Sequence, residues 1–400
     1  MLALLALSPM TTAIAFGASG TNVVQAVPAA VHTSPLVTAT PTCETTEICP
    51  YQMDNAYGFT ILHNEGINGT GQKIAIVDSC EETDIASDLK AFDSYFGLPN
   101  PTLNIYFPQG SCTENYGWGP EIAIDVEWSH AMAPGATINL VVAAEPTFTD
   151  LFGAWKYILT NHLGAEISNS WGGAGDACGS STDKLLTTLA DNNITVTAST
   201  GDSGAWPPGY GSNPANCLGV LGIGGTSLDI NSTGGYISES AWSGGGGGYV
   251  MSTKEPSFQS KVKIDDPSKL LGKPDVSADA NPYTGVWMYD TPDEGGWSCC
   301  WGGTSVSNVL WAGFIGDVNQ IRVSNGYSTL GYVNPYMYLS IYGIKGSSAL
   351  YKADMHDVKT GCNAPLGPEF CAAKGWDAAT GLGSYKANAL GPQLGDTSSA

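Results

Sequence analysis

Positive charge is scarce in this sequence of 400 residues, which holds 15 Lys and Arg against 37 Asp and Glu. The formal net charge is −22 at pH 7, and the first basic residue is Lys73. Nucleic acids and anionic membrane surfaces bind basic protein faces, so this composition argues against both as partners. At low pH many of the carboxylates are neutral, and few basic groups are present to carry positive charge, so charge repulsion within the protein is modest. The composition therefore suits an acidic setting, although it equally suits an ordinary secreted acidic protein.

Long apolar runs are lacking beyond the start of the chain. Residues 1–18 resemble the apolar region of a signal peptide, without the usual basic residues before it. A short membrane anchor is the alternative, but Pro9 and two threonines interrupt the run. Residues 19–45, rich in Ala, Val, Thr, Pro and Ser, have the composition of a low-complexity linker. We therefore expect a secreted monomer with one folded domain over residues 46–395 and no stable membrane association after removal of the signal.

Metal-binding cysteine patterns are also lacking. The ten cysteines form no Cys-x-x-Cys pair and no Cys/His array with metal-ligand spacing. An even number of cysteines scattered over a long secreted chain indicates disulfides. Cys43 with Cys49, and Cys362 with Cys371, are the easiest local bridges to expect.

A regular alternation of strand-like and helix-like segments runs through most of the chain. It predicts an α/β fold with a mainly parallel central sheet flanked by helices, in which active sites gather at the carboxyl ends of strands. The expected strands cover 72–78, 103–107, 138–143, 165–171 and 194–199, and the expected helices cover 84–96, 120–131, 149–162 and 183–192.

The stretch from Trp301 to Gly313 combines a glycine turn with the beginning of an apolar helix. Ser305 would lie at the helix N-terminus, where unpaired N–H groups and the helix dipole favour a nucleophile that develops negative charge. Ser and Thr are also the usual helix N-caps, so this stretch alone does not separate the two roles. A serine nucleophile needs a base, and none of the five histidines lies in a His-Gly-Thr-His setting.

Carboxylates provide an alternative to histidine. Glu121 and Asp125 are four residues apart on an expected helix, so they share a face, and apolar neighbours favour burial over a solvated acidic face. Two buried carboxylates push their pKa values apart, so one can stay ionised while the other holds a proton. Asp202 follows a buried strand in the turn Gly201-Asp202-Ser203-Gly204, where it is either a turn former or, when protonated, a donor to an oxyanion.

Taken in order, Glu121-x-x-x-Asp125, the Asp202 turn and Gly303-Thr304-Ser305 resemble the sedolisin family, the serine-carboxyl peptidases. The resemblance covers roughly residues 50–385. It implies a subtilisin-like fold in which Ser305 attacks a peptide carbonyl, Glu121 accepts its proton, Asp125 lies beside Glu121, and Asp202 replaces the oxyanion-binding Asn. Supporting fragments are Ala133-Pro134-Gly135-Ala136, Gly224-Gly225-Thr226-Ser227, Lys273-Pro274-Asp275-Val276 and Gly375-Trp376-Asp377-Ala378.

The same resemblance implies two binding sites. Ser170, Trp171 and Gly172 are similar to the edge along which the family pairs its peptide substrate, and the tract Gly244–Gly248 to a neighbouring cleft loop. Carboxylates and main-chain carbonyls in loops suit Ca²⁺. The calcium ligands that the resemblance implies are Asp357 and Asp377 with the carbonyls of Val358, Ala373 and Gly375.

These observations predict a secreted endopeptidase that cleaves polypeptides at acidic pH through an acyl-enzyme on Ser305. An aminopeptidase of the tripeptidyl type is an alternative, since the family contains both. A catalytically silent secreted binding protein of the same fold is another, which the intact reacting residues disfavour. The family usually carries a large N-terminal prodomain, whereas about fifty residues precede the body of this chain.

Overall fold

The structure is a computed structural model that describes residues 25–32, 40–80, 84–112, 117–174, 178–207, 211–264, 268–364 and 370–397. The expected signal segment, residues 1–18, lies outside these ranges, and the expected linker is described only at 25–32 and 40–45. No helix among the described residues has the length and apolar character needed to cross a membrane.

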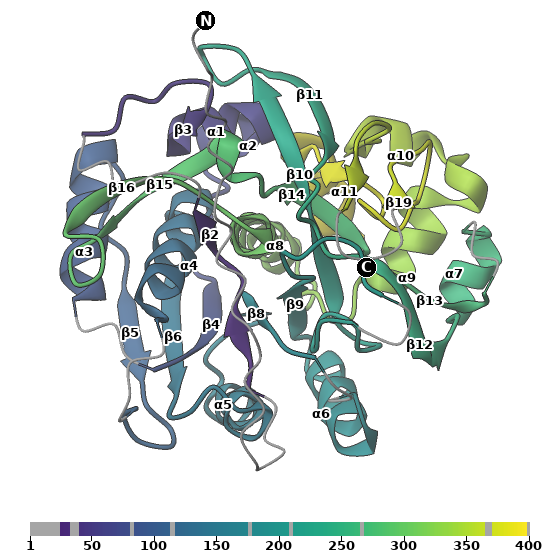
Figure 1. The fold of residues 1–400 in the computed structure, drawn as a ribbon, viewed down its shortest axis with the longest axis horizontal. Helices are drawn as coiled ribbons and strands as arrows, with labels where there is room; N and C mark the ends of the chain where they lie inside the picture. The colour runs from purple at the N-terminus through teal and green to yellow at the C-terminus, as the bar shows by residue number, and fades with distance from the viewer. Residues whose placement is uncertain are drawn as a thin grey trace, which may run out of the picture.

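An eight-stranded sheet forms the middle of the molecule (Figure 1). Its strands lie in the order β11-β10-β9-β7-β4-β6-β5, and β14 also pairs with β10. Every pairing is parallel except that of β10 with β11, so the predicted α/β fold with a mainly parallel sheet is confirmed. The strands are β4 (Lys73–Ser79), β5 (Leu103–Tyr106), β6 (Thr137–Ala143), β7 (Glu166–Ser168), β9 (Thr195–Ser199), β10 (Leu221–Ile230), β11 (Tyr236–Ala241) and β14 (Val276–Asp279).

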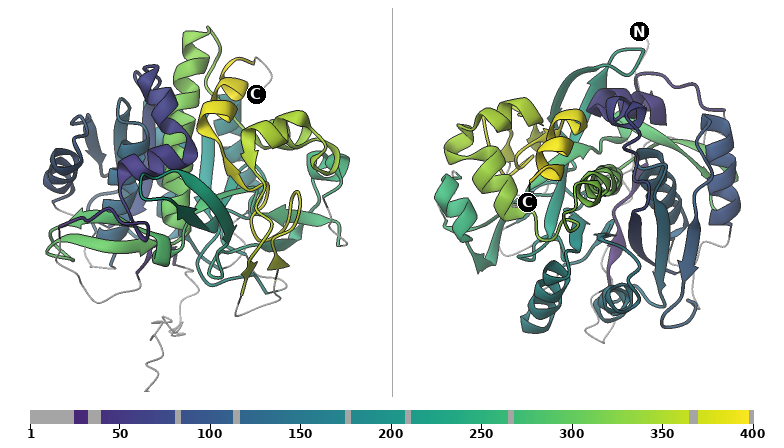
Figure 2. Two further views of the ribbon diagram at one scale, coloured as in Figure 1. Left: turned by 90° about the horizontal axis from the view of Figure 1, so that it is seen from above. Right: turned by 180° about the vertical axis from the view of Figure 1, so that it is seen from behind.

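Helices cover both faces of this sheet (Figures 1 and 2). The central helix α8 packs against α4 and against five strands of the sheet, and α3 packs against α4. On the sheet, α5 contacts β4 and β6, which α4 contacts as well, while α5 and α4 have no substantial contact with each other. The two helices therefore lie on opposite faces. The principal helices are α3 (Ile85–Phe96), α4 (Gly119–Met132), α5 (Phe148–Asn161), α6 (Ser180–Asp191), α8 (Thr304–Ser324) and α11 (Ala387–Gly395).

The strand expected over 165–171 is interrupted. β7 ends at Ser168, and a two-residue strand, β8 (Trp171–Gly172), follows after Asn169. The buried Asn169 side chain accepts a hydrogen bond from Trp155 Nε1 and donates to the carbonyl of Thr197. Its amide therefore satisfies a buried indole N–H of α5 and a main-chain carbonyl of β9 at the point where β7 ends.

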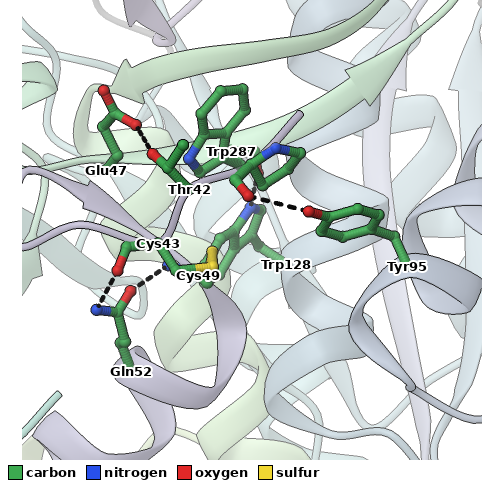
Figure 3. The surroundings of a disulfide bond; sticks show 9 residues. Thr42, Cys43, Glu47, Cys49, Gln52, Tyr95, Trp128 and Trp287 are labelled. Atoms are coloured by element: carbon green, nitrogen blue, oxygen red, sulfur yellow. Dashed lines mark hydrogen bonds between the residues drawn. A yellow bond between two sulfur atoms is a disulfide. The ribbon is translucent and has the colours of Figure 1, made fainter. Parts of the chain in front are cut away.

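The described N-terminal residues pack on the body of the protein. β1 (Val27–Pro28) pairs with β8, and β2 (Val31–His32) pairs with the end of β16 (Gly296–Gly302). Further along, the Cys43–Cys49 disulfide closes a loop before α1 (Pro50–Tyr57), and Gln52 bonds both cysteine main chains (Figure 3).

Four disulfides link eight of the ten cysteines. The expected bridges Cys43–Cys49 and Cys362–Cys371 are confirmed, and Cys80–Cys112 and Cys178–Cys217 complete the set. Cys299 and Cys300, which are adjacent on β16, carry free thiols.

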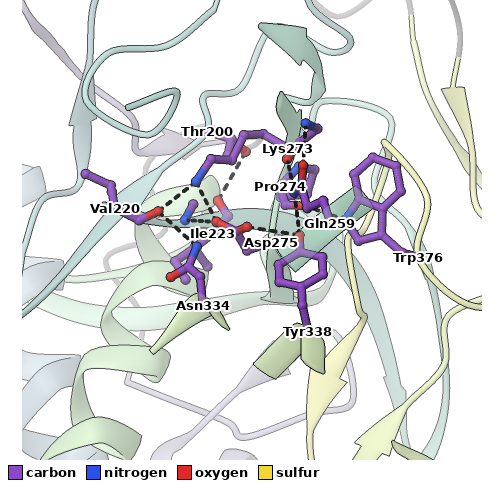
Figure 4. A network of polar contacts seen from close by, with 12 residues as sticks. Thr200, Val220, Ile223, Gln259, Lys273, Pro274, Asp275, Asn334, Tyr338 and Trp376 are labelled. Carbon is purple, nitrogen blue, oxygen red and sulfur yellow. Dashed lines mark hydrogen bonds and ion pairs between the residues drawn. The ribbon is translucent and has the colours of Figure 1, made fainter. Parts of the chain in front are cut away.

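A buried ion pair fixes the chain where it enters β14. Lys273 Nζ lies 2.5 Å from Asp275 Oδ2 and donates to the carbonyl of Val220, and Tyr338 donates to Asp275 Oδ1 (Figure 4). Burial lowers the pKa of Lys273, whereas the charge of Asp275 opposes this shift. Because each charge is paired and hydrogen-bonded, the network holds β14 in register against β10.

Candidate active site

Ser305 is the second residue of α8 and is fully buried. Gly303, the N-cap, has φ +97°, and a Cβ there would collide with the carbonyl oxygen of Ala29 and with Asp202 Oδ2. Only glycine fits this turn, which therefore brings other chain segments close to the helix N-terminus. Ser305 Oγ donates to the carbonyl of Ser170 at 3.3 Å. Of the main-chain N–H groups in this first turn, that of Thr304 donates to Asp202 Oδ1 and that of Val306 to the carbonyl of Gly303.

Glu121 and Asp125 lie one turn apart near the beginning of α4, and both are buried. The Glu121 carboxyl faces the hydroxyl of Ser305 and the main-chain N–H of Ala30, although neither of its oxygens forms a hydrogen bond of standard geometry among the described residues. Burial first, and then the nearby Asp78, raise the pKa of Glu121 well above its usual value. Burial, Asp78 and Glu121 raise the pKa of Asp125 in the same way.

Asp78 is a third buried carboxyl group at this place, and the sequence pattern does not predict it as a site residue. It is the sixth residue of β4, near the carboxyl end of the strand, and its exposed fraction is 0%. Burial raises its pKa to about 7. An acidic residue that ends an apolar strand of a parallel sheet was the available signal, because such strand ends gather at active sites.

Asp202 approaches the N-terminus of α8 from the loop after β9. Its Oδ1 accepts hydrogen bonds from Thr304 N at 2.7 Å and from Thr304 Oγ1 at 2.9 Å. The residue keeps some contact with solvent, but Oδ2 itself is buried, lacks a hydrogen bond to the described residues, and lies beside Gly303. Burial raises the pKa of Asp202 to about 7, against the lowering by both Thr304 bonds. Below that pH, a protonated Oδ2 would be a free donor.

The glycine tract at 244–248 supports the Asp202 loop. Gly246 N donates to the carbonyl of Gly201, Gly204 N donates to the carbonyl of Gly244, and Thr200 Oγ1 donates to the carbonyl of Gly246. A Cβ on Gly246 would overlap the carbonyl group of Thr200. The tract therefore allows two main chains to approach closely, which side chains would prevent.

The edge formed by Ser170, Trp171 and Gly172 lies next to Ser305 and pairs with an extended segment, which belongs to this chain itself. β1 runs antiparallel to β8, with Val27 opposite Gly172 and Pro28 opposite Trp171. The next residue, Ala29, donates its N–H to the carbonyl of Ser170 at 3.1 Å. In Figure 1 the purple strands of this segment cross the molecule beside β8 and α8.

The residues expected to bind calcium lie together, away from Ser305, in the C-terminal part of the chain. Asp357 Oδ1 accepts from Gly375 N, and Asp377 Oδ2 accepts from Ala373 N, so the two carboxylates bracket one loop. Asp377 Oδ1 accepts two further main-chain N–H groups, and Lys359 lies 3.3 Å from Asp357 Oδ2. The carboxylates thus suit a hard cation by chemistry and position, but here they face N–H groups of the loop rather than its carbonyls.

One further cluster has metal-ligand chemistry. Glu47, Cys299 and Cys300 place one carboxylate and two thiols within 4.8 Å of one another. The cluster lies on β16 and on β3 (Glu47–Ile48), which pairs with the strand next to β16. The sequence analysis did not single it out as a site.

Three curated relatives are similar to this chain. Kumamolisin from Bacillus sp. (strain MN-32) is 30% identical over 370 residues, which cover 85% of this chain and 62% of kumamolisin. Sedolisin from Pseudomonas sp. (strain 101) is 33% identical over 222 residues, covering 50% of this chain and 35% of sedolisin. Human tripeptidyl-peptidase 1 is 26% identical over 352 residues, covering 77% and 57%. The chain thus spans less than two thirds of each relative's length, and no protein-family model matches it.

A solved structure of Pseudomonas sedolisin, a serine-carboxyl proteinase, superimposes with a TM-score of 0.75 at 24% identity and covers 88% of this chain and 99% of the other. The parallel sheet, with a serine at the N-terminus of a central helix and carboxyl groups around it, defines a subtilisin-like α/β protein. These relatives and the solved structure support the sedolisin family of serine-carboxyl peptidases, the family that the motifs predict.

Proposed function

We propose that this protein is an endopeptidase that cleaves polypeptides at acidic pH, with Ser305 as its nucleophile. The observation that carries the proposal is the convergence of Ser305, Glu121 and Asp202 at the N-terminus of α8, from α8, α4 and the loop after β9. A buried glutamate whose carboxyl group faces the serine hydroxyl is placed for general acid–base catalysis. The intact set of reacting groups disfavours a catalytically silent binding protein.

In the proposed mechanism, Glu121 accepts the Ser305 proton as Oγ attacks the peptide carbonyl, and it later protonates the leaving nitrogen. Asp125 and Asp78 do not react themselves; their carboxyl groups influence whether Glu121 holds a proton. A protonated Asp202 donates from Oδ2 to the oxyanion, where a fixed donor stabilises the developing charge. Ser170, Trp171 and Gly172 align the substrate by main-chain pairing.

The length of the extended segment beside β8 supports endopeptidase activity over tripeptidyl-peptidase activity. The segment that pairs with β8 stays in contact with the protein for more than three residues on the N-terminal side of Ala29. Ala26 donates its N–H to the carbonyl of Pro146, and Gln25 forms a β-bridge with Thr147. A tripeptidyl-peptidase has to stop its substrate after three residues. Mapping the cleavage sites in a denatured protein digest would separate the activities, since release of tripeptides alone would contradict endopeptidase action.

A Ser305→Ala variant tests the mechanism. We expect hydrolysis of a denatured protein at acidic pH to fall to background in this variant, while its circular dichroism spectrum stays that of the unchanged protein. Full activity in Ser305→Ala would rule out the acyl-enzyme.

We further propose that Asp357 and Asp377, with the carbonyls of Val358, Ala373 and Gly375, bind Ca²⁺, which would neutralise two loop carboxylates and hold the loop. Because the main-chain N–H groups of the loop face these carboxylates now, binding would require its peptide groups to turn. We expect one Ca²⁺ per chain by metal analysis and a lower melting temperature after chelation. Absence of both effects would contradict the site.

The setting that we propose is extracellular and acidic. The sequence pI of about 4.3 and the four disulfides support it. An elution volume at the monomer position in size-exclusion chromatography would agree with the expected monomer.

A further inference from the structure

A cavity of about 420 Å³ lies in the C-terminal part of the chain, beside α10 (Ala349–Asp354; Figure 1) and β17 (Met355–His356). Five of the 15 Lys and Arg residues of the whole chain line it. These are Lys345, Lys352, Lys359, Lys374 and Lys386. A third of the basic residues of a chain with net charge −22 therefore meets at one place, the lysine cavity.

The lysines of this cavity come from separate segments of the chain. Lys352 lies on α10, and Lys359 follows β17. Lys374 comes from a later loop, and Lys386 is the N-cap residue of α11. The fold, and not a run of neighbouring lysines, thus brings these charges together. Since like charges repel one another, holding them at one cavity costs free energy, which a bound anion would offset.

Few carboxylates offset these charges within the protein. Among the described residues that line the cavity, Asp357 alone is acidic, and its Oδ2 lies 3.3 Å from Lys359 Nζ. Lys386 Nζ donates to the main-chain carbonyl of Lys352 at 3.1 Å, and the carboxyl group of Asp354 lies near Lys386. Five ammonium groups therefore outnumber two carboxylates at this place, even when both aspartates are ionised.

A pair of stacked rings forms one wall of the cavity. Tyr236 and His356 both line it, with ring centroids 3.7 Å apart and planes at 13°. Burial first, and then the charge of Lys386, lower the pKa of His356 to about 3, so this ring is neutral above that pH. The wall is therefore apolar, and a cleft with apolar walls and charges of one sign strengthens the local electric field.

The kind of basic residue indicates the kind of anion. A lysine ammonium group is a compact point charge that suits a phosphate oxygen, whereas the planar fork of arginine is the usual partner of a carboxylate. No arginine is present among the described residues that line the cavity. Several separate ammonium groups match several oxyanions on one molecule better than they match a single one. The volume is that of a site for a small molecule.

We propose that the lysine cavity binds a small ring compound that carries several phosphate or sulfate groups. The oxyanions contact the ammonium groups, and the carbon ring lies against the stacked side chains of Tyr236 and His356. Because the net charge of the protein repels anions in general, the binding free energy comes from the local charges. The site is independent of the proposed peptidase activity, since Ser305 does not line the cavity.

Isothermal titration calorimetry of the purified full chain tests the site with two probes of similar shape, myo-inositol hexakisphosphate and myo-inositol hexasulfate. We expect one bound ligand per chain, with a Kd at least about tenfold lower than that of inorganic phosphate, which reaches fewer of the lysines. The probe with the lower Kd distinguishes phosphate from sulfate as the preferred group. Absence of binding by both probes at about 1 mM would overturn the proposal.

Two double variants of equal charge locate the binding. Replacing Lys352 and Lys374 with Gln should raise the Kd roughly five- to thirtyfold, as expected for two partly exposed charge contacts. Lys90→Gln with Lys184→Gln removes the same charge from α3 and α6 and should leave the Kd unchanged. All four lysines are exposed, so both proteins should fold. An equal rise of the Kd in the two double variants would contradict a site at the cavity.

Thermal unfolding separates this binding from removal of Ca²⁺, because Asp357 is also a proposed calcium ligand. The hexasulfate should raise the melting temperature, since it binds the folded chain, and EGTA, which removes Ca²⁺, should not. The rise should be smaller in the Lys352→Gln, Lys374→Gln protein and intact in the Lys90→Gln, Lys184→Gln protein. A fall of the melting temperature with the hexasulfate, or an equal rise in both double variants, would overturn the proposal.

Discussion

Glu121 and Ser305 come from the first turns of two helices that pack against each other, and both side chains are buried. Burial keeps water from competing for the proton between them and raises the pKa of the carboxyl group. Asp78 lies near enough to disfavour further negative charge on Glu121, and Asp78 and Glu121 together disfavour it on Asp125. These carboxyl groups therefore titrate together, and their apparent pKa values describe the cluster as a whole, not single residues.

Replacing Glu121 with Gln removes the proposed base and keeps the shape of the side chain. We expect kcat for peptide hydrolysis to fall about 10²- to 10⁴-fold, the range for loss of a general base. Glu127→Gln is the matched control, because Glu127 is also buried on α4 and a glutamine could still accept from the N–H of Tyr289. A comparable loss in both variants would indicate damage to α4 in place of a lost base.

Asp202 gives a prediction about pH. Its pKa of about 7 means that Oδ2 is protonated at acidic pH and donates, whereas above pH 7 the ionised group repels an oxyanion. An Asn at this position donates at any pH. We expect Asp202→Asn to keep a larger fraction of its maximal kcat than the unchanged protein between pH 7 and 8. Parallel pH profiles of kcat would contradict the donor role.

The order and the spacing of a few residues in the sequence were enough to propose the site residues. These are Glu121, Asp125, Asp202 and Ser305. The acidic position of Asp78 near the end of an apolar strand is only a weak signal, because its carboxylate neighbours become apparent only when β4 lies between β6 and β7. Similarly, residues 25–32 have the composition of a linker, and their pairing depends on strand edges that are distant in sequence.

At the scale of elements, apolar periodicity predicted the strands and helices between residues 72 and 199 to within one residue at all ends but two. One is the start of α6, and the other is the end of the strand expected over 165–171, where the buried amide of Asn169 follows the early end of β7. That break depends on partners on α5 and β9, which a single segment does not contain.

The contact between α4 and α8 depends on a glycine. A Cβ on Gly313 would overlap Met132 of α4, so Gly313→Ala should push the helices apart and destabilise the protein by about 1–3 kcal/mol. Gly391→Ala in α11 is the control, since its Cβ would meet only ordinary contacts and alanine favours the helix. Denaturant unfolding measures both, and equal stability of the two variants would contradict the close-approach argument.

At the scale of the whole molecule, buried carboxyl groups should make stability depend on pH. Burial raises the pKa of Glu166 to about 8 from 4.5, so the folded protein binds a proton there that the unfolded chain releases. This contribution to stability is present below about pH 4.5 and is lost as the pH rises through 8, by the sign of proton linkage. Asp78 acts in the same direction up to about pH 7.

We therefore expect the free energy of unfolding to be larger at pH 4 than at pH 8, and Glu166→Gln to flatten this dependence by a few kcal/mol, on the order of 1.4 kcal/mol per pKa unit. In that variant the amide oxygen can still accept from Thr197. Glu65→Gln, at an exposed position, is the control and should leave the slope unchanged. A protein that is more stable at pH 8 than at pH 4 would contradict the prediction.

β1 and β2 belong to the same polypeptide as Ser305, and they pair with β8 and β16. Their effective concentration at these strands therefore does not change when the protein is diluted. A strand tethered to its own site has an effective concentration on the order of mM. A free peptide has to exceed that concentration to displace the strand from β8, so its binding should depend on the peptide concentration and be the same at every protein concentration.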